Sequence, residues 1–192
     1  MEALQSWFVV FYDSDDNNKA GMSKKNFPET ELVQTLENSW TVNFINKEIG
    51  PSELITFSEL TDWIENENDK IKFYSGTAIY TSTFNYTKNK DSGDVFIDLG
   101  RVGVMASVKI NGKAIGTTWI APFKLNTNEA LKDGENTIEV EVVNVWRNRL
   151  TGDRALDKDT RTTWVIVDSV KKAEELVPSG LLGPVTIQTI KK

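Results

Sequence analysis

The side chains best suited to chemistry gather in one stretch of the sequence, residues 144–163, and directly after it. An indole offers a flat apolar face to a sugar ring, while Asn, Arg and Asp offer oriented polar groups to its hydroxyls. Long loops of a β-protein often carry function, so this composition indicates carbohydrate contact. The residues that we assign to such a contact are Trp146, Asn148, Arg149, Asp153, Arg161 and Trp164, with Trp119 earlier in the chain.

A purely structural role for the same residues is the alternative, and we favour it, because a fold by itself rarely fixes a function. Arg149, Asp153 and Arg161 would then pair with one another and hold the loop in place. Trp146 and Trp164 would fill the core.

The remaining tryptophans are interpreted as packing residues. Trp7, Trp40 and Trp63 lie in or beside apolar runs, so we expect them in the core or at an interface with a neighbouring domain. Trp119 follows a predicted hairpin and precedes Ala121-Pro122-Phe123. That position would suit a sugar platform, but we expect the indole to pack beneath its loop.

Composition excludes several other kinds of chemistry. The 192 residues contain no cysteine and no histidine, which removes disulfides, thiolate metal sites, cysteine nucleophiles and the Ser-His-Asp triad. A formal net charge of -6 would not draw the chain to nucleic acid or anionic lipid. No stretch approaches the roughly 20 apolar residues of a membrane span.

Acidic residues do not form a convincing metal or catalytic site. Residues 13–17 match the first half of a calcium loop, but Asn18 and Lys24 stand where that loop needs Gly and Glu. A glycosidase needs two carboxylates roughly 5–10 Å apart. Asp153 with Asp157 or Asp159 is the cluster to consider, and nothing nearby predicts a raised pKa. We therefore expect a non-catalytic chain with no metal site that the sequence can place.

Short strands must position these residues. Residues 77–86 alternate with period two, and Asn111-Gly112 marks a tight hairpin because both positions tolerate positive φ. One capped helical turn is expected at 58–63, whereas 144–163 is expected to be a loop. The predicted strands are residues 31–36, 39–45, 77–86, 95–99, 106–110, 114–118, 123–125, 137–143, 163–167 and 185–190. They indicate an all-β sandwich.

The sequence divides into two parts on this interpretation. Residues 22–192 form the β-sandwich domain. Residues 1–21 hold a strand-like run, Trp7 to Tyr12, and a polar loop. Whether this segment is the tail of a preceding domain stays open.

Ordered motifs carry a resemblance to a known family. The sequence is similar to the sugar-binding domain of glycoside hydrolase family 2, a galactose-binding-like jelly roll, in the stretches Ile110 to Gly116, Trp119 to Phe123, Leu131 to Val140 and Pro178 to Val185. It more closely resembles the C-terminal β-sandwich of bacterial α-L-rhamnosidases, glycoside hydrolase family 106, in Ile71 to Ala78, Asp98 to Gly100 and Asn144 to Asp153.

The resemblance implies a jelly-roll β-sandwich that is one module of a bacterial glycoside hydrolase. The catalytic carboxylates would lie in a separate barrel domain, which would be this module's partner, and residues 144–153 would be the loop lent to its cleft. The parent enzyme would be periplasmic or extracellular. Galactose-binding-like domains often hold a structural calcium, but no motif here places one, and no other cofactor is expected.

Three functions are compatible with these observations. The first, which we favour, is packing on the catalytic barrel, which predicts an exposed apolar patch near Trp7 and residues 46–63. The second is an autonomous carbohydrate-binding module for plant-type oligosaccharides. The third is a protein-interaction domain that uses an exposed strand edge or an apolar patch.

Overall fold

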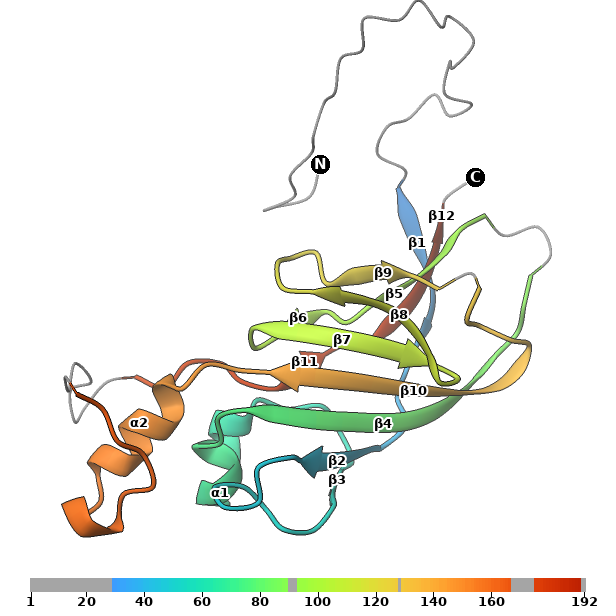
Figure 1. Ribbon diagram of the computed structural model, residues 1–192. Coiled ribbons are helices and arrows are strands. Elements are labelled where there is room, and N and C mark those ends of the chain that lie inside the picture. The colour runs from blue at the N-terminus through green and yellow to red at the C-terminus, as the bar shows by residue number, and fades with distance from the viewer. Residues whose placement is uncertain (1–28, 90–92, 128, 167–174, 191–192) are drawn as a thin grey trace, which may run out of the picture.

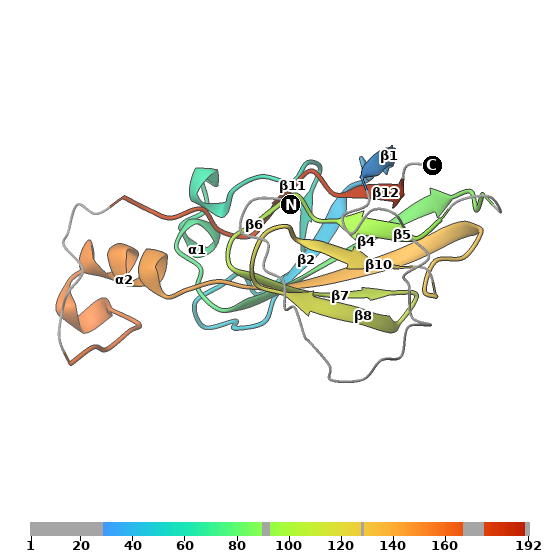
Figure 2. The ribbon, with the colours of Figure 1, turned by 90° about the horizontal axis from the view of Figure 1, so that it is seen from above.

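The computed structural model describes residues 29–89, 93–127, 129–166 and 175–190. Strands in two facing antiparallel sheets make up most of the regular secondary structure in this part of the chain, so the predicted all-β sandwich is confirmed. Figure 2 shows the two layers, with β12 and β5 on one side and β7 and β8 on the other. The predicted strand at Trp7 to Tyr12 and the polar loop after it lie outside the described residues.

The larger sheet has six strands, ordered β3-β2-β4-β10-β7-β8. They are β2 (Trp40–Phe44), β3 (Ile55–Phe57), β4 (Thr77–Tyr86), β7 (Met105–Ile110), β8 (Lys113–Thr118) and β10 (Gly134–Val143). β4 has the predicted limits, and every second residue from Ala78 to Tyr86 is buried. Tyr80 lies between Val42 on β2 and Val140 on β10. Period-two alternation thus sends one face of each strand into the core.

The smaller sheet has four strands, ordered β1-β12-β5-β9, and a short pair lies beside it. They are β1 (Thr30–Thr35), β5 (Val95–Asp98), β9 (Lys124–Asn126) and β12 (Thr186–Ile190), with β6 (Arg101–Val102) paired to β11 (Leu181–Gly183). Residues of both sheets, such as Ile97 and Ile138, belong to one cluster of buried apolar side chains. β3, β6 and β11 escaped prediction because strands of two or three residues leave a pattern that is easily missed, although β9, which has three residues, was predicted at 123–125.

The Asn111-Gly112 hairpin between β7 and β8 forms as predicted. Asn111 has φ 52° and Gly112 has φ 78°, which are the positive values that this turn requires. The Asn111 side chain also donates to the Asn136 side chain at 2.8 Å and accepts from the Thr137 amide at 3.1 Å. These bonds fix the turn against the start of β10.

Five aromatic side chains fill the end of the sandwich beneath β2 and β4. The rings of Trp63 and Tyr80 are stacked with an angle of 3° between their planes, and Trp63 Nε1 donates to the Tyr80 hydroxyl at 2.6 Å. Phe44 and Tyr74 meet the same indole, and Trp40 contacts Tyr80 edge-on. Trp40 and Trp63 are therefore core residues, as predicted.

Four short helices interrupt the strands in the described part of the chain: η1 (Trp63–Glu65), α1 (Asp69–Lys72), α2 (Arg147–Arg154) and η2 (Lys158–Thr160). The expected turn at 58–63 is displaced: Asp62, rather than Ser58, caps η1 by accepting from the Ile64 amide at 3.2 Å. α2 corrects the prediction of a loop over 144–163. Its sequence is almost wholly polar, so it lacks the apolar stripe that marks a helix.

Candidate functional site: the α2 lobe

The candidate site residues cluster in a part of the molecule that we call the α2 lobe, residues 145–166. It contains α2, η2 and the segment that follows them. Both ribbon views show α2 beyond the ends of the sheets, at the far left (Figures 1 and 2). The lobe follows β10 directly, so the larger sheet positions its beginning.

The entrance to the lobe is fixed to the sandwich by polar contacts. Asn144 Nδ2 donates to the Tyr74 carbonyl at 2.9 Å, and Asn144 Oδ1 accepts from the Gly76 amide at 2.9 Å. Ser75 Oγ donates to the Val145 carbonyl at 2.8 Å. Buried polar groups that are paired in this way hold their backbone in one position.

Asn148 ties α2 to the segment that leads into β11. Its Nδ2 donates to the Val177 carbonyl at 2.7 Å and to Ser179 Oγ at 2.8 Å, and its Oδ1 accepts from the Val177 amide at 2.8 Å. Ser179 in turn donates its amide to Asp62 Oδ1 at 2.9 Å. Because Asn148 is buried and both ends of its amide are engaged, it is a structural residue in this lobe.

Arg149 and Asp153 form a buried ion pair on one face of α2. Asp153 Oδ2 also accepts from the Thr163 amide at 2.8 Å and from the Thr163 hydroxyl at 2.5 Å. Burial would raise the pKa of Asp153, but the hydrogen bonds from Arg149 and Thr163 and the Arg149 charge outweigh it and lower that pKa. Asp153 thus stays ionised, which is the opposite of what a glycosidase general acid needs.

The structural alternative for these residues is confirmed in one pair and corrected elsewhere. Arg149 and Asp153 pair as that alternative predicts. Arg161 does not join them: its Nε donates to the Leu156 carbonyl at 3.2 Å, and it has no ion pair within the described residues. The predicted strand 163–167 is also wrong over 163–166, because the Thr163 amide is committed to Asp153 rather than to a strand ladder.

Trp146 and Trp164 do not fill the core, which corrects the second half of the structural alternative. Their exposed fractions are 55% and 82%. Together they line a cleft of about 350 Å³, whose other walls are Leu150, Thr162, Thr163 and Val165. Trp146 caps the start of α2 with a helical backbone conformation and Leu150 follows four residues later, so both lie on one helix face. Sequence reasoning missed Leu150 because it treated this stretch as a loop.

Trp119 is a further correction. The sequence predicts that it packs beneath its loop, yet 70% of its surface is exposed, and its neighbour Ile120 is exposed as well. It lies in the connection between β8 and β9 and does not line the cleft of the α2 lobe. The structure therefore brings together Trp146 and Trp164 but not Trp119.

Metal ligands do not gather in the part of the chain that the structure describes: it contains no group of three or more His, Cys, Asp or Glu side chains able to hold a metal ion. The partial calcium-loop motif at 13–17 lies outside those residues. None of the described helices is long and apolar enough to cross a membrane.

A family model for the galactose-binding domain-like domains of glycosyl hydrolase family 2 matches residues 51–174. The chain belongs to this family. The predicted resemblance to the family 2 sugar-binding domain is thus confirmed, and a galactose-binding-like β-sandwich fits the two sheets described above.

Two relatives show how members of this family occur in longer chains. A Formosa agariphila protein named "Putative beta-glucuronidase" is 39% identical over 185 residues, which cover 81% of this chain and 15% of that protein. The structure of a rhamnosidase from Novosphingobium sp. PP1Y matches with a TM-score of 0.79 and 33% identity, over 87% of this chain and 16% of its own. This galactose-binding-like domain therefore corresponds to about a sixth of each relative.

A more distant solved structure shares the fold alone. The beta-glucuronidase of an uncultured Clostridium sp. is 18% identical, with a TM-score of 0.59 over 86% of this chain and 30% of that chain. The family thus places the chain among domains associated with glycoside hydrolases, and its geometry must indicate what it does there.

Proposed function

We propose that this chain is a non-catalytic module of a rhamnosidase-like bacterial glycoside hydrolase, and that it docks on the catalytic domain of that enzyme through the α2 lobe. The exposed apolar surface of the lobe carries this proposal. Its large exposed apolar side chains are Val145, Trp146, Leu156, Trp164, Val165 and Ile166. An apolar surface of this kind on one part of a small domain marks a site of interaction, and tryptophan is enriched where such interfaces are tightest.

The polar residues of the lobe support docking on protein rather than on sugar. A sugar site needs polar groups that converge on the hydroxyls of the ligand. In the lobe, the Asn148 amide and the Asp153 carboxylate are bonded within the protein, and the hydroxyls of Thr162 and Thr163 lie against Asp153. The surface that remains is mainly apolar, which suits a protein partner.

Carbohydrate contact is the second candidate function, and the two exposed indoles in one cleft favour it. A sugar ring could stack on either indole face. An autonomous carbohydrate-binding module would then take a plant-type oligosaccharide here, with Trp146 and Trp164 as its platform.

The rhamnosidase-like part of the proposal is supported by the match to the Novosphingobium structure. Its TM-score of 0.79 exceeds the 0.59 of the beta-glucuronidase from the uncultured Clostridium sp.. On that basis the parent enzyme would belong to glycoside hydrolase family 106 and would be periplasmic or extracellular.

Oxidative footprinting of the enzyme that contains this chain tests the docking proposal. Hydroxyl radicals should modify Trp146 and Trp164 in the isolated chain at a rate close to that of Trp119, and should spare Trp63 as a buried reference. In the whole enzyme the rates at Trp146 and Trp164 should fall by about tenfold, because a docked domain covers them. Equal oxidation in the two samples would contradict the proposal.

Calorimetry decides the second candidate. The isolated chain is titrated with rhamnose- and galactose-containing oligosaccharides, and W146A/W164A is compared with W119A. Heat that disappears only in W146A/W164A would establish sugar contact in the cleft. Absence of heat from the unmodified chain would remove this candidate.

A further inference from the structure

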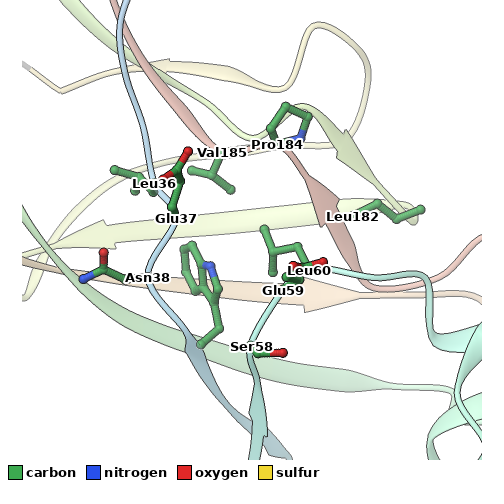
Figure 3. A pocket seen from close by; sticks show the side chains of 10 residues that line it. Leu36, Glu37, Asn38, Ser58, Glu59, Leu60, Leu182, Pro184 and Val185 are labelled. Atoms are coloured by element: carbon green, nitrogen blue, oxygen red, sulfur yellow. The ribbon is translucent and has the colours of Figure 1, made fainter.

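A second hollow lies on the sandwich itself, and we call it the groove. It has a volume of about 550 Å³ and forms where three connections meet, namely those after β1, after β3 and between β11 and β12 (Figure 3). No residue that lines it belongs to the α2 lobe. Its lining residues are Leu36, Glu37, Asn38, Trp40, Ser58, Glu59, Leu60, Leu182, Pro184 and Val185.

The walls of the groove are held by backbone contacts. The Leu36 amide donates to the Val185 carbonyl at 2.9 Å, and Trp40 pairs with Phe57 in the β2–β3 register. Asn38 Nδ2 donates to the Thr83 carbonyl at 2.6 Å. The first of these bonds joins the connection after β1 to the one between β11 and β12, and the other two contacts hold the start of β2 against β3 and β4. The groove is therefore a preformed feature of the fold.

The inner surface of the groove is apolar. Leu36, Trp40 and Val185 are buried within it, Leu60 and Leu182 are half-buried, and Pro184 is exposed. Leu60 also lies in the 46–63 segment, where the sequence predicts an exposed apolar patch. An occupant must therefore bring aliphatic surface of its own if it is to displace water from these side chains.

Two carboxylates stand at the rim. Figure 3 shows Glu37 on the connection after β1 and Glu59 on the connection after β3. Both are exposed, and neither has a hydrogen bond or ion pair within the described residues. The formal net charge of the whole chain is -6, so its overall field also favours a cation here.

One side chain meets both requirements. Arginine and lysine have an aliphatic stem that packs on apolar surface and a charged end that stays at the rim. Arginine has the better geometry of the two, because its planar guanidinium forms paired hydrogen bonds with a carboxylate. The volume leaves room for the neighbours of that arginine, so the fitting ligand is a short peptide segment.

We propose that the groove binds a segment in which an arginine adjoins an aliphatic residue, and that another domain of the same enzyme supplies it. The source of the segment depends on the proposed function, in which this chain is one module of a multidomain glycoside hydrolase. The chemistry of the groove does not depend on that function. The guanidinium pairs with Glu37 and Glu59, and the aliphatic groups cover Leu60 and Leu182.

An NMR titration of the isolated full chain tests the chemistry. The probe is acetyl-Leu-Arg-amide, and its matched control is acetyl-Leu-citrulline-amide, which has the same shape without the charge. We expect millimolar binding of the arginine peptide, with shifts concentrated at the Trp40 indole, Leu60 and Leu182. Equal binding of the citrulline peptide, shifts located elsewhere, or no binding would overturn the proposal.

Variants separate the carboxylates from general charge. E37Q/E59Q should weaken binding roughly five- to tenfold, as expected for two partly exposed ion pairs. E31Q/E67Q removes two exposed carboxylates outside the groove and should leave binding unchanged. W146A/W164A should also leave it unchanged, so a failure of lobe docking and a failure of the groove are distinguishable. An equal loss of peptide affinity in E31Q/E67Q would mean that only the overall charge matters, which would contradict the proposal. Displacement of the peptide by a rhamnose- or galactose-containing oligosaccharide would identify a sugar site instead.

Photo-crosslinking in the whole enzyme identifies the source of the segment. Benzoylphenylalanine replaces Ser58 at the groove or, as a control, Thr117 on β8, and mass spectrometry locates the adduct. We expect Ser58→benzoylphenylalanine to react with an arginine-containing segment of another domain, and the control to give no such product. Adducts confined to residues 1–28 of this chain or to a second copy of it, or no adduct, would overturn the assignment of that source.

Discussion

Tryptophan occupies opposite environments in the sandwich and in the α2 lobe. Trp40 and Trp63 are almost completely buried between the sheets, whereas Trp146 and Trp164 lie mostly in solvent. The polar residues are reversed as well, since Asn148 and Asp153 in the lobe are buried and hydrogen-bonded. The sandwich is thus stabilised by apolar packing, and the lobe by polar contacts.

The difference follows from layering. A strand in the sandwich has a second sheet opposite it, so its apolar face is covered within the domain. The eight-residue helix of the lobe lies beyond the sheets and has no such layer (Figure 1). Buried hydrogen bonds fix its position, and its apolar side chains stay available for another surface. That contrast makes the lobe the better candidate for a docking element.

The largest effect is expected from Trp63→Ala. It removes a fully buried indole that stacks on Tyr80 and donates to its hydroxyl, so the free energy of unfolding should fall by about 3–5 kcal/mol. Trp164→Ala is the matched control and should change that free energy by less than about 0.5 kcal/mol. Urea denaturation measures both. Similar losses in the two variants would remove the contrast between the regions.

Asp153→Asn should favour local unfolding of the α2 lobe while the sandwich stays folded. The substitution leaves Arg149 buried without its partner charge and weakens the attachment of Thr163. The free energy of local unfolding of the lobe should therefore fall by about 3 kcal/mol. Hydrogen exchange should accelerate across residues 145–166 but stay unchanged in β4 and β10. Asp157→Asn, at an exposed neighbouring acid, is the control and should have no effect. Faster exchange throughout the sandwich in Asp153→Asn would show that the two regions unfold together.

Gly152→Ala tests how closely the lobe approaches the sandwich. A methyl group at Gly152 would lie 2.6 Å from Phe73 Cγ, beside α1, so the substitution should destabilise by about 1–2 kcal/mol. In a Phe73→Ala background the clash is absent, and the better helix propensity of alanine should make the same substitution neutral or slightly stabilising. Thermal unfolding of the four proteins measures this. A loss of equal size in both backgrounds would exclude the contact with Phe73 as its cause.

The smallest expected effect is the loss of stability of the α2 lobe at low pH. Because the folded-state pKa of Asp153 lies below its ordinary value of 3.8, the stabilisation is complete above that value and is lost as the pH falls through the folded pKa. The NMR signal of the Thr163 amide, which donates to Asp153, should therefore titrate with a midpoint below pH 3.8. The same signal in Asp153→Asn should show no such step. A midpoint above 3.8 would mean that the ion pair does not dominate this site.

The candidate site was predictable in part. Composition and spacing point to residues 144–164, and a structural role for these residues predicts the observed pairing of Arg149 with Asp153. The exposure of Trp146, Trp164 and Trp119 was not predictable, because an indole in a polar stretch has the same sequence signal whether it packs inward or faces solvent. The groove was equally hidden, since one of its walls, residues 182–185, lies more than a hundred residues along the chain from the other two.

The sequence alone determined the sandwich: alternation in β4 and β10 specifies strands with one apolar face, and Asn111-Gly112 specifies the hairpin between β7 and β8. These signals are local, because side-chain direction in a strand depends only on the position of the residue along it. Tertiary structure alone decided that α2 is a helix and that its tryptophans face outward. The contacts responsible, from Asn148 to Val177 and from Asp153 to Thr163, join residues that become neighbours only after the chain has folded.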